Sequence, residues 1–225
     1  MSEVGARLTC DSLHELVANL AAEDRGVADL DELLADHWLD VVVTRLRQQS
    51  AATEQPVREF ACTMVAALLD PHASAYLQVG DGCIVVGTAA GYEPVTWPSG
   101  GDYVNTTHFL TDDSVVDNVQ FYLKRPPVEE IALFTDGLQM LALQFSTKSA
   151  HAPFFAPMFQ RLRLESVGES IVVSGLLSDY LGSALINRRT DDDKSLVLAT
   201  RRSLPDTVRR NSGPMGSDHS DADHE

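Results

Sequence analysis

A short apolar run that ends in Asp-Gly is the feature that most constrains this chain. Residues 131–135 read Ile-Ala-Leu-Phe-Thr, Asp136 and Gly137 follow at once, and a helical pattern resumes after them. An apolar run bounded in this way predicts a strand buried on both faces, and the glycine permits a tight turn. The carboxylate of Asp136 can then point out of the sheet at the end of the strand, where it is a suitable ligand for a hard cation such as Mg²⁺ or Mn²⁺. Asp-Gly is also a common turn pair without any ligand, and this alternative stays open.

The acidic composition argues against a nucleic-acid surface. The 225 residues include 17 Lys and Arg against 33 Asp and Glu, a net charge of −16. Neutralising phosphates requires a basic patch, so we expect neither nucleic acid nor an anionic membrane as a partner. The length and the 44% apolar content fit one large domain, or one domain with a tail.

Cysteine usage and the lack of targeting signals predict a cytoplasmic protein. Cys10, Cys62 and Cys83 form no C-x-x-C pair and are expected to be reduced and buried. The N-terminus shows no charged leader followed by an apolar core. No apolar run approaches the roughly 20 residues needed to cross a bilayer.

Hydrophobic periodicity predicts helices at both ends of the chain and strands in the middle. Gly80-Asp81-Gly82 separates two apolar runs and predicts a β-hairpin. The segment 91–102 is expected to be a loop or short hairpin. Predicted helices cover 4–20, 30–46, 154–162 and 169–187, and predicted strands cover 60–69, 75–79, 83–87, 119–123, 131–135 and 196–200. In the last helix, Val172, Leu176, Leu177, Tyr180, Leu181, Ala184 and Leu185 are expected to face inward.

A second acidic turn, Asp191-Asp192-Asp193, precedes the last predicted strand. Asp136 follows one strand and Asp192 precedes another, so in adjacent antiparallel strands both carboxylates fall at the same end of the sheet. Two carboxylates there could share a hard metal ion. A solvated turn without a ligand is the alternative.

Four motifs along the chain carry a family resemblance. They are Gly80-Asp81-Gly82, Asn105-x-Thr107-x-Phe109-Leu110-Thr111, Leu133-Phe134-Thr135-Asp136-Gly137 and Asp191-Asp192-Asp193-Lys194-Ser195-Leu196-Val197-Leu198. Their order and spacing resemble the metal-dependent protein phosphatase 2C family, most closely its compact bacterial branch. The resemblance covers about residues 3–201.

The resemblance implies a fold, a reaction and partners. The fold would be α+β, a four-layer α-β-β-α sandwich of two antiparallel sheets flanked by helices, over residues 1–201. Residues 202–225, with few apolar side chains, would form a disordered acidic tail. The reaction would be hydrolysis of phosphoserine or phosphothreonine, with two Mn²⁺ or Mg²⁺ ions holding the attacking water. A phosphorylated protein or a cognate Ser/Thr kinase would be the partner.

The resemblance also assigns residues. Asp136 and Asp192 match metal ligands of the family, with Asp191 and Asp193 in reserve because the register is uncertain by one. Gly80, Asp81 and Gly137 match structural positions, and Asp81 is expected to brace its turn rather than bind metal.

One departure from the family pattern concerns the N-terminus. Family members begin with strands that supply a further metal-binding Asp, and residues 1–7 here resemble the start of the helix that follows them. The expectation is an N-terminally incomplete sandwich with exposed sheet edges and an incomplete metal pair. Three explanations stay open: an active enzyme with further upstream sequence, a non-catalytic pseudophosphatase that binds a phosphoprotein or kinase, or strands donated by another chain.

Other chemistries have little support in the sequence. The histidines lack H-x-x-x-H and H-E-x-x-H spacing, and no G-x-S-x-G elbow or Walker-type loop occurs. Arg188 and Arg189 lie beside the acidic turn and could contact phosphate, but we interpret them as helix-end cations.

Overall fold

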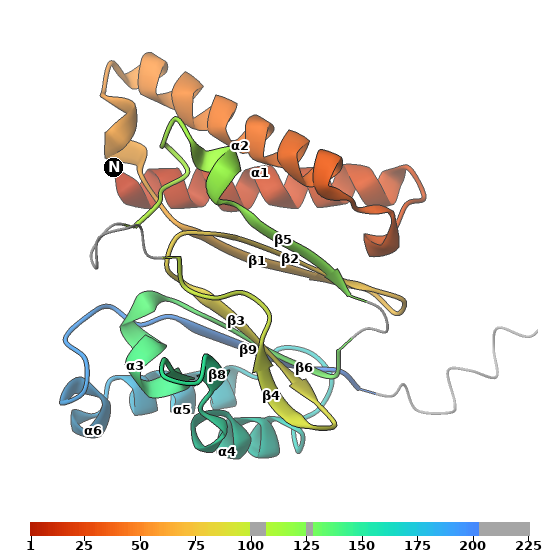
Figure 1. Ribbon diagram of the computed structural model, residues 1–225, viewed down its shortest axis with the longest axis vertical. Helices are drawn as coiled ribbons and strands as arrows, with labels where there is room; N and C mark the ends of the chain where they lie inside the picture. The colour runs from red at the N-terminus through yellow and green to blue at the C-terminus, as the bar shows by residue number, and fades with distance from the viewer. Residues whose placement is uncertain (100–106, 125–127, 203–225) are drawn as a thin grey trace, which may run out of the picture.

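The computed structural model describes residues 1–99, 107–124 and 128–202, and in these residues the chain forms four layers (Figure 1). Two long helices cover one face of a first sheet, a second sheet packs against its other face, and the remaining helices cover the second sheet. The expected α-β-β-α sandwich of two antiparallel sheets is therefore confirmed.

The two sheets share an antiparallel pattern but differ in size. The first has the strand order β1-β2-β5, and the second has the order β4-β3-β6-β9. Their strands are β1 (Met64–Leu69), β2 (Ser74–Val79), β3 (Cys83–Thr88), β4 (Gly91–Pro94), β5 (Gln120–Lys124), β6 (Glu130–Phe134) and β9 (Leu196–Thr200), with a small separate pair β7 (Leu143–Gln144) and β8 (Ser149–Ala150).

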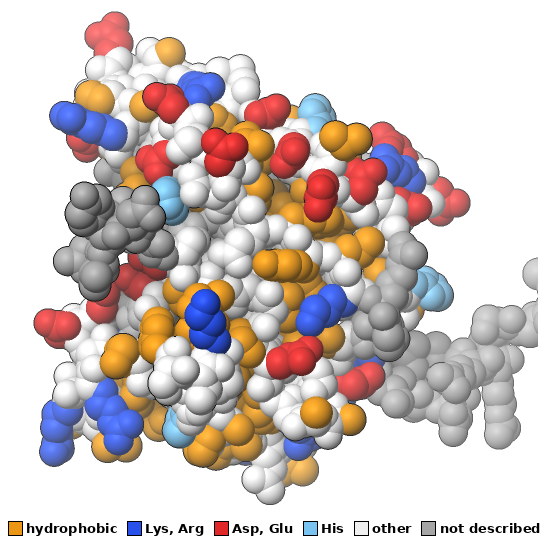
Figure 2. All heavy atoms as spheres, in the orientation of Figure 1, with side chains coloured by type: hydrophobic (Ala, Val, Ile, Leu, Met, Phe, Trp, Pro, Cys, Tyr) orange, Lys and Arg blue, Asp and Glu red, His pale blue; other side chains and the backbone are white. Residues whose placement is uncertain are grey.

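The first helical layer consists of α1 (Ser2–Ala22) and α2 (Glu32–Thr53). Asp31 caps α2 by accepting the Leu34 N–H at 2.8 Å. One stripe of α2, at spacings of three and four residues, is buried against the first sheet: Ala35, Leu39, Val42, Val43 and Leu46. On the face shown in Figure 2, acidic side chains are most numerous over this helical layer.

The second helical layer consists of α3 (Gln139–Ala142), α4 (Ala152–Leu162), α5 (Ile171–Leu181) and α6 (Ala184–Asn187). Phe155 and Phe159 of α4 are fully buried against Phe134 of the second sheet. Between the sheets a separate cluster packs Tyr76 against Ile84, Val86 and Ile131. Short 3₁₀ turns, η1 (Val27–Asp29), η2 (Val57–Phe60), η3 (Val115–Asn118) and η4 (Asp136–Leu138), complete the described elements.

The β-hairpin predicted around Gly80-Asp81-Gly82 is wrong. β2 pairs with β1 and β5, whereas β3 pairs with β4 and β6, so the turn carries the chain from one sheet to the other. Both strands are almost fully buried central strands, and each needs a neighbour on either side within its own sheet. Gly80 has a φ of +100°, a backbone conformation that glycine adopts at little cost.

The single helix predicted over 169–187 is two helices, because Ser183 interrupts it and caps α6. The predicted inward face is also partly wrong. Val172, Leu176 and Leu185 are 70%, 55% and 61% exposed, whereas Val173, Leu177 and Leu181 face the protein. In a helix that is apolar on most sides, periodicity does not identify the buried face.

Strands β1 and β9 lie at the edges of their sheets. Val197 of β9 pairs with Leu133 of β6. Leu133 packs in the layer between the sheets, whereas Val197 is 61% exposed. Within the described residues, β1 and β9 each pair with a strand on one side only, and the link between these edges and missing N-terminal strands stays a prediction. Asn105 and the predicted tail beyond Arg202 lie outside the described residues. Within the described part of the chain, no helix has the length and apolar content to span a membrane.

Candidate functional site

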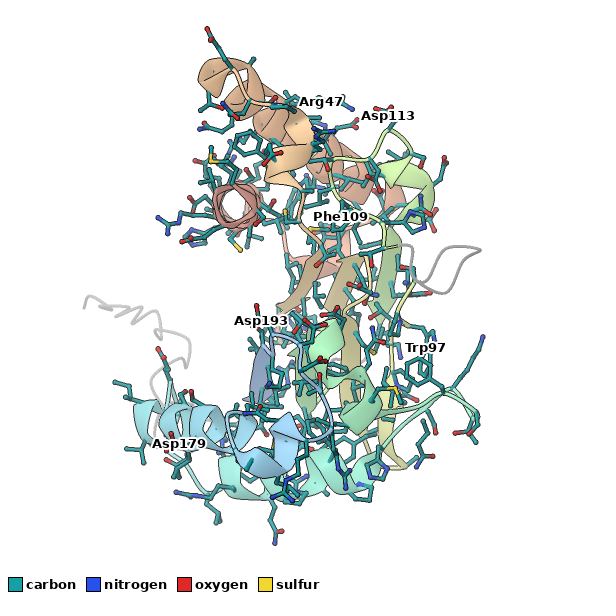
Figure 3. The ribbon with its side chains drawn as sticks, turned by 90° about the vertical axis from the view of Figure 1, so that its left-hand side faces the viewer. Arg47, Trp97, Phe109, Asp113, Asp179 and Asp193 are labelled. Carbon is teal, nitrogen blue, oxygen red and sulfur yellow. The ribbon has the colours of Figure 1, made fainter. Side chains whose placement is uncertain are left out.

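Three acidic turns meet at one end of the two-sheet sandwich. They are the 80–82 connection between the sheets, the turn after β6 that carries Asp136, and the turn before β9 that carries Asp192. Figure 3 views the molecule from this end, and the labelled Asp193 lies near the centre of the view. Segments more than fifty residues apart in the sequence therefore present carboxylates in one place.

The turns of Asp136 and Asp192 are joined by the ladder between β6 and β9. Antiparallel pairing places Phe134 opposite Leu196. Just beyond, the Thr135 N–H donates to the Ser195 carbonyl at 3.2 Å, and the Ser195 N–H donates to Thr135 Oγ1 at 3.0 Å. The sequence-based expectation that the two segments meet at one sheet end agrees with this geometry.

Gly137 allows the two turns to touch. A Cβ atom on Gly137 would lie 2.2 Å from the backbone oxygen of Asp193, far inside van der Waals contact. Each carboxylate is also held within its own turn, since Asp136 Oδ1 accepts the Gly137 N–H and Asp192 Oδ1 accepts the Asp193 N–H, both at 2.9 Å. Glycine is therefore the residue that this close approach requires.

The electrostatics of Asp136 reflect its acidic neighbours. Burial raises the pKa of Asp136, and so do the nearby carboxylates of Asp81 and Asp192 and a hydrogen bond shared with Asp192, while the Gly137 N–H opposes the shift. Repulsion between these neighbouring carboxylates favours the binding of a positively charged group. A divalent cation such as Mg²⁺ is one such partner, because its usual protein ligands are carboxylate oxygens.

Asp81 is both braced and close to the pair. Thr107 Oγ1 donates to Asp81 Oδ2 at 2.6 Å, and Gln139 Nε2 donates to the Asp81 backbone oxygen at 2.6 Å. The bracing expected from the sequence is present, and in addition the charge of Asp81 raises the pKa of Asp136.

The choice among Asp191, Asp192 and Asp193 follows from the same contacts. The carboxylate of that turn that acts on Asp136 is the one on Asp192. Asp193 contributes its backbone, with its N–H donating to the Asp192 carboxylate and its carbonyl against Gly137. All three aspartates of the turn are exposed, so exposure does not distinguish them. The geometry therefore favours Asp192 over both reserves.

The carboxylate oxygens are the type of ligand atom that a hard divalent ion prefers. Two carboxylates are enough for an ion that keeps several water molecules as its other ligands. Mg²⁺ is commonly held by one or two carboxylates, with water in the remaining positions, and the Asp136–Asp192 pair offers that arrangement. Across the described residues, however, no three or more Asp, Glu, His or Cys side chains are placed so as to enclose an ion together.

Cations near the site serve structural roles. Arg188 Nε donates to the Ala184 carbonyl at 3.2 Å, which agrees with its interpretation as a helix-end cation. Lys194 Nζ donates to Asn187 Oδ1 at 3.0 Å and to the Asp192 backbone oxygen at 3.1 Å.

The sequence interpretation missed two side chains that join the acidic turns, Thr135 and Gln139. Thr135 belongs to the Leu133–Gly137 motif, but its hydrogen bond is with Ser195, sixty residues later. Gln139 follows Asp136 by three residues, and a buried strand followed by a short 3₁₀ turn places it over the 80–82 turn. A polar residue so near a strand-end Asp was the available signal.

A cavity of about 740 Å³ lies away from the acidic turns, between α4, α5 and β9. Its lining is mainly apolar, including Phe154, Met158, Leu177 and Leu198, and its charged members are Arg161 and Glu169. Such a lining lacks the grouped carboxylates found at the sandwich end, so we place the candidate chemistry at the acidic turns.

Comparison with known proteins identifies relatives. A family model described as Protein phosphatase 2C matches residues 1–181. The chain is similar to serine/threonine-protein phosphatase 3 of Escherichia coli strain K12, with 36% identity over 174 residues, which are 77% of this chain and 69% of that protein.

Solved structures show a similar fold. One is the catalytic domain of the serine/threonine protein phosphatase PstP in complex with two manganese ions, with a TM-score of 0.57, 15% identity, and coverage of 87% of this chain and 79% of that one. Another is the Mycobacterium tuberculosis phosphatase PstP/Ppp, with a TM-score of 0.54, 12% identity, and coverage of 87% and 80%.

Proposed function

The chain belongs to the protein phosphatase 2C family, and from this we propose that it hydrolyses phosphoserine and phosphothreonine in proteins with the help of Mn²⁺ or Mg²⁺. The proposed site is the acidic end of the sandwich, with Asp136 and Asp192 as metal ligands and Asp81 beside them. A phosphorylated protein is the proposed substrate, and the Ser/Thr kinase that makes it is a proposed partner.

The observation that carries the proposal is the meeting of the Asp136 and Asp192 carboxylates at one end of the second sheet. A divalent cation would neutralise the grouped carboxylates, and carboxylate oxygens are ligands that such ions take. A bound Mn²⁺ or Mg²⁺ supplies charge that offsets the phosphate and makes a water molecule more acidic.

The chain's own residues prepare the site for that ion. Thr135 ties the Asp136 turn to Ser195, which lies opposite Thr135 just before β9. Gly137 allows the two turns to lie in contact, and the Gly137 and Asp193 N–H groups orient the two carboxylates. Orientation before binding reduces the entropy lost on binding.

The test is hydrolysis of a phosphothreonine peptide by the purified protein, with Mn²⁺ added and then removed by a chelator. We expect hydrolysis that depends on Mn²⁺ and that falls by a factor of about a hundred or more in Asp136→Asn, because removing a ligand charge weakens the site. Asp179→Asn, on the exposed side of α5, is the matched control and should retain full activity. Hydrolysis absent with Mn²⁺, both for this chain and for the full product of its gene, contradicts the proposal.

A non-catalytic role is the second candidate, because the described residues group no three metal-binding side chains around one point. In that case the domain binds a phosphoprotein or a kinase without turnover. Fluorescence anisotropy of a labelled phosphothreonine peptide separates the two: binding that survives Asp136→Asn, together with no release of phosphate from either protein, supports the pseudophosphatase.

A further inference from the structure

Gln139 links two of the acidic turns through a side chain. Its Nε2 donates to the backbone oxygen of Asp81 at 2.6 Å, across 58 positions of sequence. Gln139 is half-buried at the start of α3, directly after the η4 turn that begins with Asp136. One amide group therefore spans from the Asp136 turn to the 80–82 connection.

The 80–82 connection needs such support. Asp81 lies between two glycines, and glycine leaves the backbone more conformational freedom than any other residue. The carboxylates of Asp81 and Asp136 are close enough for their charges to interact, and like charges repel. A hydrogen bond from Gln139 to the Asp81 carbonyl holds the turn against that repulsion.

The remaining contacts hold the same turn from other directions. The Gly80 carbonyl accepts hydrogen bonds from Ser99 Oγ at 2.7 Å and from Gln78 Nε2 at 3.1 Å, and Thr107 holds the Asp81 carboxylate. These groups lie on β2 and on the segments around 99 and 107. Gln139 differs from them because it lies three residues after Asp136, directly after the η4 turn that Asp136 begins.

The chemistry of a glutamine suits this position. Its neutral amide donates a hydrogen bond without adding positive charge, whereas a Lys or Arg would pair with the carboxylates and compete with a cation for them. The turns of Asp136 and Asp192 are already joined through Thr135 and Ser195. The Gln139 contact therefore bears on the distance between Asp81 and the joined turns of Asp136 and Asp192.

We propose that Gln139 is a positioning residue that sets the placement of Asp81 relative to Asp136 and thereby the affinity of the acidic end for a divalent cation. That the bound ion is Mn²⁺ or Mg²⁺ rests on the proposed function. The role of Gln139 rests on its hydrogen bond to Asp81. Gln139 itself acts through the Asp81 backbone and is not assigned as a ligand.

The test replaces Gln139 with leucine, which has a similar size and no donor, and measures Mn²⁺ binding from the electron paramagnetic resonance signal of free Mn²⁺. We expect the dissociation constant for Mn²⁺ to rise roughly tenfold, the lower end of the range for loss of an outer hydrogen-bond partner at a metal site, because Gln139 acts on Asp81 and not on an assigned ligand. Gln48→Leu makes the same change on an exposed position of α2 and should leave the dissociation constant unchanged. Gln139→Met is the second variant if the leucine protein does not fold.

A double-mutant cycle separates positioning from a general structural role. If Gln139 acts through Asp81, Gln139→Leu should have no further effect on Mn²⁺ binding in an Asp81→Asn background. An effect of equal size in both backgrounds overturns the proposal, and so does an unchanged Mn²⁺ affinity in the single variant.

A metal-free measurement keeps this proposal distinct from the proposed function. In the apoprotein, the ¹³C chemical shift of the Asp81 carbonyl should move in Gln139→Leu and not in Gln48→Leu, because the carbonyl loses its donor. A wild-type protein that takes up no Mn²⁺ overturns the proposed function and the affinity effect together. An unmoved carbonyl shift shows that the Gln139 contact itself does not exist.

Discussion

Gly137 and Asp193 are in contact through their backbones, so closely that a methyl group on Gly137 would lie 2.2 Å from the Asp193 carbonyl oxygen. This contact sets how near the turn of Asp136 comes to the turn of Asp192. A backbone contact, rather than a side-chain contact, therefore sets the spacing of the acidic end.

Gly137→Ala should separate the two turns. The Cβ atom must move to an ordinary contact distance of 3.4–4 Å, so a shift of more than an ångström is forced on one turn. A displacement of that size can lower a reaction rate by about a hundredfold, and we expect a loss of this order in Mn²⁺-dependent hydrolysis. Gly175→Ala is the control, because its Cβ meets open space within α5 and should stabilise that helix by about 0.5–1 kcal/mol. Full activity in Gly137→Ala contradicts the contact.

Asp136→Asn should raise the thermal stability of the metal-free protein while abolishing activity. Burial and the carboxylates of Asp81 and Asp192 disfavour the ionised form of Asp136, so a neutral amide relieves repulsion that the folded state otherwise contains. Thermal unfolding in the presence of a chelator measures the change in Tm. A lower Tm for Asp136→Asn than for Asp179→Asn would show that the acidic turns do not repel one another.

Arg163→Met should destabilise the protein through Glu130. The Glu130 residue is only 6% exposed and accepts from Arg163 Nε at 2.6 Å, and the Tyr92 hydroxyl is a weaker donor at 3.3 Å. Removing the cation leaves a buried carboxylate, at a cost of about 1–3 kcal/mol, which is below the range for a fully buried pair because half of Arg163 is exposed.

The matched control for Arg163 lies on the same helix. Arg161 pairs with Glu165 at 2.6 Å near the surface, and Arg161→Met should cost less than about 1 kcal/mol. Urea denaturation of both variants measures the free energy of unfolding. Equal losses would mean that the burial of Glu130 is unimportant.

Asp70 should make stability depend on pH. Desolvation alone would raise the pKa of Asp70, but hydrogen bonds from the backbone N–H groups of His72, Ala73 and Val27 outweigh it and lower the pKa. The stability that Asp70 contributes is therefore present above the unfolded pKa of about 3.9 and is lost as the pH falls through the lower folded value.

Comparing Asp70→Asn with the wild type over a range of pH tests this. The variant should be less stable at neutral pH, and the difference should shrink in acid, where the wild-type carboxyl is protonated. Asp179→Asn should show no such convergence. A difference between Asp70→Asn and wild type that is constant with pH would contradict the assignment.

The three cysteines should react in a fixed order. Cys10 is exposed, Cys62 is half-buried with a pKa raised by burial, and burial raises the pKa of Cys83 to about 12. Only the thiolate reacts with alkylating agents, so native protein at mildly alkaline pH should be labelled first at Cys10 and at Cys83 only after unfolding. Peptide mapping by mass spectrometry reads the order, and Cys10→Ser should remove the fast phase. Labelling of Cys83 in the native protein would contradict its burial.

Much of the architecture could be predicted from local pattern, and the main errors have a physical cause. Strand β6 and the helices α1 and α2 follow from apolar spacing, which reports burial directly. The turn at Gly80-Asp81-Gly82 predicts a hairpin wrongly, because a short glycine turn between apolar runs is compatible both with a hairpin and with passage between two sheets. Only the partners of β2 and β3 distinguish these, and those partners are far away in the sequence.

The site was predictable in part for a similar reason. Asp136 and Asp192 could be identified because each lies at the end of a strand, and strand pairing brings such ends together. Gln139 is polar and close to Asp136 in the sequence, but local pattern does not identify its partner, a backbone oxygen 58 positions away.

The strands alternate between the sheets along the chain: β1 and β2 lie in the first, β3 and β4 in the second, β5 again in the first, and β6 and β9 in the second. While the protein is being synthesised, β2 can pair with β1 but lacks its second neighbour, β5, until residue 124 has been added. In the same way, β6 can pair with β3 but lacks its second neighbour, β9, until residue 200 has been added. Neither half of the polypeptide is then an independent folding unit, and the ribosome must release nearly the entire domain before its native pairing is complete.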